Sequence, residues 1–245
     1  QAEIALHQPG EAGIDLGRST RVDTRVRPSD EVLQALAARI LKAERPVIVT
    51  GDEIVKSDAL KEAAAFAETL GAPVYQCSTP YGAHFLSENP CFMGALTRLQ
   101  KQVRETLQPY DLMIVLGADP LRMSVYSEVD PMPDGLSMVQ VGLVDWDLAK
   151  NYGADIAVKA DVRETLRALV PALKAAGGAA LESRAKAGIA ALSAKNWTAK
   201  RKVLVEQISK AATKSPIDPD WLALQLMEAM PDNAILVDEG LTSSR

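Results

Sequence analysis

The 245-residue sequence has few aromatic residues, few cysteines and no long apolar run. Its longest apolar runs, such as Leu112–Leu116, are far shorter than the ~20 residues that cross a bilayer, which argues against a membrane protein. The two cysteines cannot make a disulfide framework and no apolar signal segment follows the N-terminus, so we expect a cytoplasmic protein. Because 27 Lys and Arg face 32 Asp and Glu, general attraction to nucleic acid is not expected.

The sequence also lacks three fingerprints of common α/β enzymes. It contains neither the P-loop pattern G-x-x-x-x-G-K-[ST] nor the nucleophile-elbow pattern G-x-S-x-G. No G-x-G-x-x-G follows an expected strand. Gly51 is instead followed by Asp52 and Glu53, two carboxylates that would repel a pyrophosphate. These absences argue against a P-loop NTPase, a common hydrolase and an ordinary NAD site.

What the sequence does contain, from Ser29 onward, is an alternation of short β-branched runs and amphipathic segments. We expect strands at Pro46–Gly51, Ala72–Cys77, Asp111–Gly117, Met138–Gly142 and Ala154–Lys159. Helices are expected from Ser29 or Asp30 through Leu41, from Ser57 to Leu70, through Leu99–Leu107, and from Asp161 to Leu173. Runs that are apolar on both faces are typical of parallel strands covered by helices. The pattern predicts an α/β fold: a doubly wound, mostly parallel, Rossmann-like open sheet of about five or six strands, with helices on both faces.

Four regions follow from this pattern. Residues 1–28 are predicted to be a linker, and residues 29–175 a central α/β domain. Residues 176–215 are predicted to be a connector and a helix: the small residues Ala175–Ala180 are expected to be flexible, and Leu181–Lys210 helical. Residues 216–245 carry a helix that starts at Asp218-Pro219 and a strand at Asp232–Gly240. One helix and one strand cannot bury a core alone, so this last region is interpreted as the truncated start of a further domain.

Several polar groups are candidates for chemistry. Cys77, His84 and Cys91 lie seven residues apart in sequence and could bind zinc, although a structural site needs a fourth ligand and buried structural cysteines are the favoured interpretation. Separately, the loop carboxylates Asp145, Asp147 and Asp155 could serve acid–base chemistry or bind Mg²⁺, with capping of the next turn favoured.

An open sheet of this kind binds ligands beyond the carboxyl ends of its strands. The alternative function is therefore a stand-alone module that binds FAD, ADP, coenzyme A or NAD near Gly117–Asp119 and Asp145–Tyr152. In that case Trp146 or Tyr152 could stack on a base, although a packing role at the domain edge is favoured for both.

The order of the segments carries more information than any one of them. The relevant segments are Pro46–Gly51, Ala72–Tyr75, Glu88–Gly94, Asp111–Ala118, Val144–Asp147, Ala154–Asp161 and Ala234–Ser244. In this order they resemble the central domain, and then the opening of the pyrophosphate-binding domain, of thiamine diphosphate-dependent enzymes. The similarity is strongest to the benzoylformate decarboxylase and acetolactate synthase-like branch.

The resemblance implies a chain that is part of a three-domain enzyme. Gln1–Pro28 would be the tail of a first domain, which supplies an activating glutamate, and Ile217–Arg245 the start of a third, which supplies the Mg²⁺ and diphosphate site. The whole enzyme would use thiamine diphosphate and Mg²⁺ for carbon–carbon cleavage or ligation at a 2-oxo acid. This chain alone is expected to bind neither and to have no turnover. Its expected partners are the two missing catalytic domains and further copies, in a homodimer or homotetramer.

The resemblance also suggests site residues. The candidate cofactor contacts are Glu239, Gly240, Leu241, Thr242 and Ser243. Benzoylformate decarboxylases carry a His just before Pro-Cys-Phe in the long central loop, where this sequence has Asn89 and has His84 five residues earlier. Asn89 and His84 are therefore weak catalytic candidates in a chain with no complete catalytic site and no expected metal site. Because Asp52 and Glu53 would repel a diphosphate, we do not expect FAD or ADP either.

Overall fold

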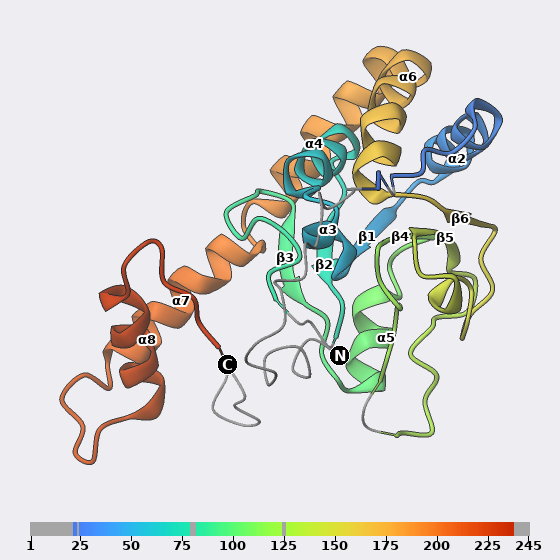
Figure 1. Cartoon of the computed structure of the whole chain (residues 1–245). Helices are drawn as coiled ribbons and strands as arrows, with labels where there is room; N and C mark the ends of the chain where they lie inside the picture. The colour runs from blue at the N-terminus through green and yellow to red at the C-terminus, as the bar shows by residue number, and fades with distance from the viewer. Residues whose placement is uncertain (1–21, 24, 79–81, 124–125, 238–245) are drawn as a thin grey trace, which may run out of the picture.

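A computed structural model describes residues 22–23, 25–78, 82–123 and 126–237. At its centre is a six-stranded, all-parallel sheet (Figure 1). The strands are β1 (Pro46–Thr50), β2 (Val74–Gln76), β3 (Phe92–Ala95), β4 (Leu112–Leu116), β5 (Ser137–Gly142) and β6 (Ile156–Lys159). Their order, β3-β2-β1-β4-β5-β6, is that of a Rossmann sheet, so the predicted fold class is confirmed. Among the described residues, none of the helices combines the length and apolarity that a bilayer crossing requires.

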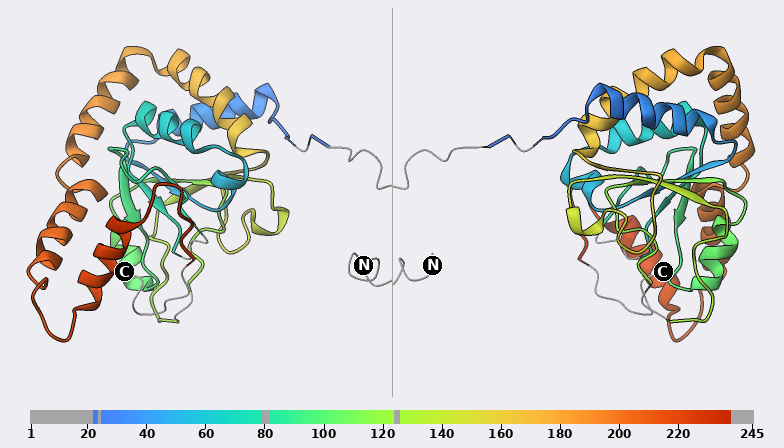
Figure 2. Two further views of the ribbon diagram at one scale, coloured as in Figure 1. Left: turned by 60° about the vertical axis from the view of Figure 1, so that its left-hand side comes forward. Right: turned by 90° about the vertical axis from the view of Figure 1, so that its right-hand side faces the viewer.

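The two central strands show why the sequence forms this sheet. Every residue of β1 and of β4 is buried, and the two strands pair from Pro46 with Leu112 to Thr50 with Leu116. Such continuous apolar strands are stable only when helices cover both faces. Figure 2 shows α2, α4 and α6 on one face of the sheet and α5 on the other. These helices are α2 (Asp30–Lys42), α4 (Leu60–Leu70), α5 (Gln100–Leu107) and α6 (Val162–Leu192).

Close helix packing fixes the outer layer. A Cβ on Gly71, at the end of α4, would lie 2.4 Å from the backbone oxygen of Ala185 in α6, and one on Gly188 would lie 2.3 Å from the backbone oxygen of Gly71. Arg163 of α6 adds an ion pair with Glu62 of α4, at 3.1 Å. The two helices are therefore in backbone contact, which larger side chains at these glycines would prevent. We call β1–β6 with α2, the short α3 (Glu53–Lys56), α4, α5 and α6 the sheet domain.

The structure corrects the predicted flexible connector at Ala175–Ala180. These residues lie inside α6, which continues through them and is kinked at Gly178, where φ is 51° and ψ is −146°. Leu173 and Leu181, on either side, are both buried. Their burial outweighs the low helix propensity of the two glycines, about 1 kcal/mol each, so the predicted break between the two helical segments is confined to Gly178.

The predicted helix Leu181–Lys210 is in fact two helices. It breaks before Asn196, whose side chain accepts a hydrogen bond from the amide of Ala199 and so caps α7 (Trp197–Ser209). A third helix, α8 (Pro219–Ala229), packs mainly against α7. We call α7 and α8 the arm, which projects from the sheet domain on the left of Figure 1. The first turns of α7 cover the edge strand β3, where the Lys200 ammonium donates to the Met93 carbonyl at 3.1 Å.

Three further predictions are corrected in detail. The edge strand β3 is not among the predicted strands. The predicted helix start at Ser57 is replaced by the short α3 (Glu53–Lys56) and then α4, which begins at Leu60. The strand expected at Asp232–Gly240 is not formed in its described part, residues 232–237. Of the predicted linker, only residues 22–23 and 25–28 are described, and these lie in neither a helix nor a strand.

Candidate functional site

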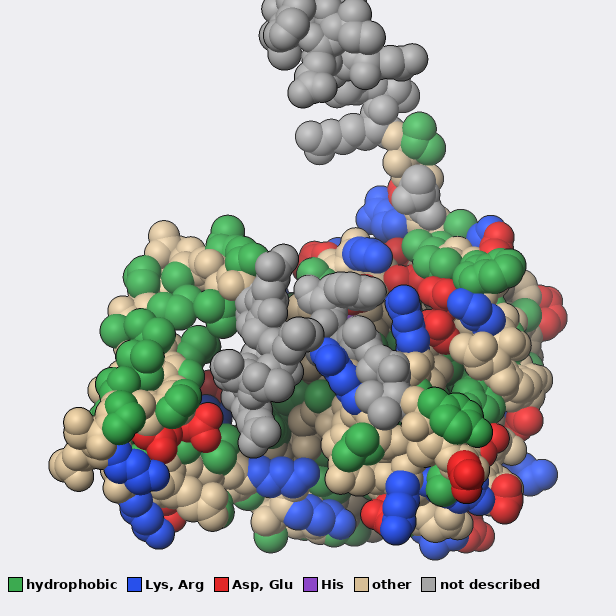
Figure 3. Space-filling model, turned by 90° about the horizontal axis from the view of Figure 1, so that it is seen from below, with side chains coloured by type: hydrophobic (Ala, Val, Ile, Leu, Met, Phe, Trp, Pro, Cys, Tyr) green, Lys and Arg blue, Asp and Glu red, His purple; other side chains and the backbone are tan. Residues whose placement is uncertain are grey.

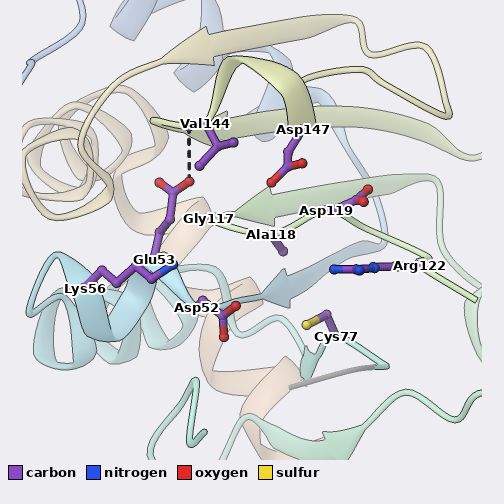
Figure 4. A pocket seen from close by; sticks show the side chains of 10 residues that line it. All are labelled: Asp52, Glu53, Lys56, Cys77, Gly117, Ala118, Asp119, Arg122, Val144 and Asp147. Carbon is purple, nitrogen blue, oxygen red and sulfur yellow. Dashed lines mark hydrogen bonds between the residues drawn. The ribbon is translucent and has the colours of Figure 1, made fainter. Parts of the chain in front are cut away.

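A small cavity, which we call the crevice, lies at the carboxyl ends of the central strands (Figure 4). Its free volume is about 480 Å³, open mouth included. It is lined by Asp52, Glu53, Lys56, Cys77, Gly117, Ala118, Asp119, Arg122, Val144 and Asp147. The crevice lies where the strand order reverses, between β1 and β4, which is the usual ligand site of an open α/β sheet.

Two glycines allow the loops after β1 and β4 to touch. A Cβ on Gly51 would lie 2.5 Å from the Gly117 carbonyl oxygen. Gly117 has a φ of +61°, and a Cβ there would lie 2.4 Å from the Cβ of Glu53. Any side chain at either position would push α3 away from β4. The glycines therefore serve to place Glu53 deep in the crevice.

Glu53 accepts hydrogen bonds from the backbone amides that directly follow β5. Its side chain is buried, and its carboxylate accepts hydrogen bonds from the amides of Leu143, at 2.7 Å, and Val144, at 3.3 Å. Burial raises the pKa of Glu53 above its usual value, and the two amide hydrogen bonds oppose that shift. Amides at such a strand end are the groups that could bind a phosphate, so the chain's own carboxylate occupies an anion site.

The remaining wall of the crevice is held by Gln140 on β5. Its amide nitrogen donates to the carbonyls of Ala118 and Asp147, and its side-chain oxygen accepts from the amide of Ala149. This buried side chain joins the loop after β4 to the loop after β5. Burial, with the neighbouring charge of Asp147, raises the pKa of Asp119. Carboxylates thus outnumber cations among the lining residues.

The loop carboxylates considered for acid–base or Mg²⁺ chemistry do not converge. Asp145 forms an exposed ion pair with Lys159, and Asp155 one with Arg39, leaving only Asp147 in the crevice. No group of three or more His, Cys, Asp or Glu residues in the described ranges is arranged to hold a metal ion. The magnesium alternative is therefore not supported by these three residues.

The predicted aromatic candidates also lie apart from the crevice lining. Trp146 is largely exposed and packs under the ammonium of Lys150, 5.2 Å from its ring centre. The Tyr152 hydroxyl hydrogen-bonds to Asp130 at 3.2 Å. Tyr152 packs against the core, as the favoured interpretation expects, whereas Trp146 is too exposed to fill a packing role.

His84, a weak catalytic candidate, lies beside the crevice. Its ring is buried, its Nδ1 is 3.8 Å from the Cys77 Sγ, and its Nε2 is 2.6 Å from the Asp52 Oδ1. Desolvation lowers the pKa of His84, and the nearby Asp52 carboxylate opposes the shift. Because Cys77 and Asp52 contact opposite ring nitrogens, the three groups cannot all bind one metal ion.

Cys91 and Asn89 lie at the other end of the sheet, because both precede β3 and amino ends share one edge of a parallel sheet. The Asn89 side chain accepts from the Cys91 amide at 2.9 Å and donates to Glu68 at 2.7 Å. Burial, with the charge of Glu68, raises the pKa of the Cys91 thiol to about 12. The structure thus separates Cys91 from the other two residues of the zinc alternative, and Asn89 from His84.

The candidate cofactor contacts Glu239, Gly240, Leu241, Thr242 and Ser243 lie outside the described residues. The groups missed by sequence reasoning are Glu53 as a buried hydrogen-bond acceptor and Asp52 as the partner of His84. The only sequence signal for either was the pair of carboxylates directly after a glycine at a strand end.

The sequence matches the model of a known protein family. Residues 33–169 match the family model described as thiamine pyrophosphate enzyme, central domain. The chain belongs to this family. The matched range contains all six strands and ends within α6.

The similar proteins include decarboxylases, acetyltransferases and synthases. The chain is 28% identical to benzoylformate decarboxylase of Pseudomonas aeruginosa over 163 residues, which is 66% of this chain and 31% of that protein. It is 27% identical to the acetolactate synthase large subunit of Corynebacterium glutamicum over 164 residues, 66% of this chain and 25% of that protein. The solved structure of the thiamine diphosphate-dependent 4-hydroxybenzoylformate decarboxylase of Rhodococcus jostii RHA1 superposes with a TM-score of 0.58 at 27% identity, covering 64% and 29%. The chain thus spans less than a third of the length of each.

Full-length enzymes of this family use thiamine diphosphate and Mg²⁺, but the described residues do not fit that cofactor. Four carboxylates and only two cations line the crevice, and Glu53 accepts hydrogen bonds from the amides of Leu143 and Val144. A diphosphate would meet a net negative charge there, and the amides of Leu143 and Val144 already have an acceptor. The sheet domain is therefore a member of the family without a recognisable diphosphate site among its described residues.

Proposed function

We propose that this chain is the central region of a thiamine diphosphate-dependent 2-oxo acid decarboxylase or carboligase. It acts there as a scaffold and oligomerisation domain between two catalytic domains. The observation that carries the proposal is the crevice: at the point where this fold usually binds a ligand, the chain inserts its own Glu53. The family match over residues 33–169 supports the same role.

The arm supports the assignment of the C-terminal region to a further domain. Its helix α8 has no buried residue, and the large apolar side chains exposed on the arm and after it gather in Figure 3, left. These are Val203, Leu204, Leu222, Leu226, Met227, Ile235, Leu236 and Val237. We propose that the pyrophosphate-binding domain covers this surface and that Glu239–Ser243 approach the cofactor there. The intact protein is proposed to be a homodimer or homotetramer.

In the intact enzyme, the thiazolium ring of the cofactor supplies the electron sink for carbon–carbon cleavage or ligation. The residues of this chain hold the flanking domains in position and contribute no complete catalytic set. We therefore expect the isolated chain to show no turnover of a 2-oxo acid.

Calorimetric titration of the 245-residue chain with thiamine diphosphate and Mg²⁺ tests the proposal. We expect no heat of binding at micromolar cofactor concentrations. A dissociation constant in the micromolar range would show that the chain carries its own diphosphate site, and would contradict the scaffold role.

A second candidate is the nucleotide-binding module, favoured by the position of the crevice at the strand-order reversal. Thermal unfolding in the presence of FAD, ADP, coenzyme A or NAD separates the two functions. A ligand at 100 times its dissociation constant stabilises the folded chain by about 2.7 kcal/mol. Stabilisation of the wild-type chain would favour the module. Stabilisation of Glu53→Ala alone would show that Glu53 closes an otherwise competent site, and no stabilisation of either would favour the scaffold.

A further inference from the structure

Cys77, His84 and Asp52 form a constellation that the scaffold role does not use. Cys77 lines the crevice, and Figure 4 shows its sulfur turned toward the cavity. The Sγ of Cys77 lies 3.8 Å from Nδ1 of His84, whose Nε2 lies 2.6 Å from Asp52 Oδ1. A thiol, an imidazole and a carboxylate in this sequence of contacts are a nucleophile, its base and the group that orients the base. We propose that Cys77 is a reactive thiol, activated by His84, that is modified by peroxide and other small uncharged electrophiles.

The state of His84 is the first step of the argument. The ring is 1% exposed, and although Nε2 is close to Asp52 it makes no hydrogen bond of normal geometry with the described residues. A proton on Nε2 is therefore held mainly by the charge of Asp52, which leaves Nδ1 with a lone pair facing the thiol. The Thr50 carbonyl and Asp52 favour the protonated ring, while burial and Lys56 disfavour it, with a pKa below the usual value as the result. Neutral at pH 7, the ring can accept the thiol proton.

Cys91 provides a comparison within the same chain. It is fully buried before β3, and the charge of the Glu68 carboxylate opposes its ionisation. Burial without a base raises its pKa to about 12, so it should be inert. Cys77 differs in having both a base and a cavity. The two thiols should therefore react at very different rates.

The surroundings restrict the class of reagent. The amide of Cys77 donates to the Thr50 carbonyl at 2.9 Å, so it cannot stabilise an oxyanion as the nucleophile's amide does in acyl transfer. Displacement at an oxygen or an alkyl carbon needs no oxyanion site. The same cavity is lined by two cations, Lys56 and Arg122, and by four carboxylates, so its excess of negative charge disfavours anionic reagents. A small neutral electrophile such as hydrogen peroxide meets both conditions.

The reaction with peroxide is balanced without another reagent. The thiol proton passes to Nδ1 of His84 as the sulfur attacks one peroxide oxygen. The S–O bond forms, the O–O bond breaks, and the leaving hydroxide takes up the proton as water. Cysteine is oxidised to the sulfenic acid and the peroxide is reduced.

Alkylation of the folded 245-residue chain by iodoacetamide, followed by mass spectrometry of the two cysteine peptides, tests the assignment. We expect Cys77 to be labelled at least ten times faster than Cys91, and roughly 100-fold faster than Cys77 in a His84→Gln variant. In the wild type the rate should already be near its plateau at pH 7. In His84→Gln it should rise through a pH near 8.5, the pKa of an ordinary thiol. Asp52→Asn, at a positioning residue, should shift the wild-type profile to an intermediate position.

A matched peroxide experiment tests the sulfenic acid. Dimedone should trap an adduct on Cys77 in the wild type and leave Cys77→Ser unlabelled. Circular dichroism and thermal unfolding identify variants that have lost the fold. If His84→Gln keeps the fold and its Cys77 is labelled at the same rate and with the same pH profile as in the wild type, the proposed activation is wrong. Equal labelling of Cys77 and Cys91 in the native chain would overturn it as well.

Discussion

The sheet domain and the arm differ in how far their apolar side chains are buried. Every residue of β1 and β4 is buried, and helices cover both faces of the sheet. In the arm, α8 has no buried residue, and Leu226 and Met227 are 58% and 53% exposed. Burial of apolar surface contributes about 25 cal/mol per Å² and is the main source of folding free energy, so the sheet domain is stabilised by its own core. The arm depends on its contact with β3 and, as proposed, on a further domain.

A matched pair of Leu→Ala substitutions gives the largest expected contrast. Leu166 of α6 is fully buried and Leu226 of α8 is mostly exposed. Leu166→Ala should lower the free energy of unfolding by about 2–5 kcal/mol, because it leaves a cavity in a packed core. Leu226→Ala should change it by no more than ~0.5 kcal/mol. Urea unfolding of both variants measures the difference, and equal losses would show that the arm packs as tightly as the sheet domain.

A second pair compares a buried carboxylate contact with an exposed one. Glu53→Ala leaves the amides of Leu143 and Val144 without their acceptor, which should cost about 1–3 kcal/mol of unfolding free energy. Lys214→Ala breaks the exposed ion pair with Asp218 in the arm, where a loss of at most about 1 kcal/mol is expected. Denaturant unfolding at neutral pH measures both, and a larger loss for Lys214→Ala would reverse the ranking.

The pH dependence of Glu53 has a definite sign. Its pKa in the folded chain is raised above 4.5, so the folded chain holds the proton more tightly than the unfolded chain does. Its contribution to stability is therefore full below pH 4.5 and is lost as the pH rises through the raised pKa. Relative to Glu53→Gln, which has no such proton, the wild type should lose unfolding free energy over the pH range above 4.5 in which its raised pKa lies. An unchanged difference over that range would contradict the raised pKa.

The smallest effect is expected from removing α8. A chain that ends at Lys214 loses a helix with no buried residue, so the unfolding midpoint of the sheet domain should move by only a few degrees. Thermal unfolding followed by circular dichroism measures it. A drop comparable to that of Leu166→Ala would mean that α8 stabilises the sheet, and would remove the contrast between the two regions.

Much of the sheet was predictable, because β1 and β4 are short runs in which nearly every residue is apolar. The edge strand β3 was missed because it has four residues, contains Gly94 and follows a loop rich in turn residues. At Ala175–Ala180 local propensity predicts a long break, but packing of Leu173 and Leu181 favours helix on both sides and leaves only the kink at Gly178. The local sequence pattern thus predicted the correct secondary structure where burial and propensity favour the same element.

The candidate site was less predictable, since its contacts join residues far apart in sequence. Glu53 meets the amides of Leu143 and Val144 across some ninety residues, and no periodicity encodes that contact. Cys77 and His84 were visible as neighbours in sequence, but Asp52 joins them only through the fold. The carboxylates after Gly51 were interpreted as repelling a phosphate, although one of them in fact takes the position a phosphate could have.

The placement of Glu53 also sets a competition that any soluble anion would face. A ligand tethered to the same chain acts at an effective concentration on the order of millimolar or more. A free phosphate or carboxylate with the same intrinsic affinity must therefore be more concentrated than this before it displaces Glu53 from the amides of Leu143 and Val144. Among weakly binding metabolite anions, the two amides therefore stay bound to the Glu53 carboxylate, and the crevice does not take up such an anion.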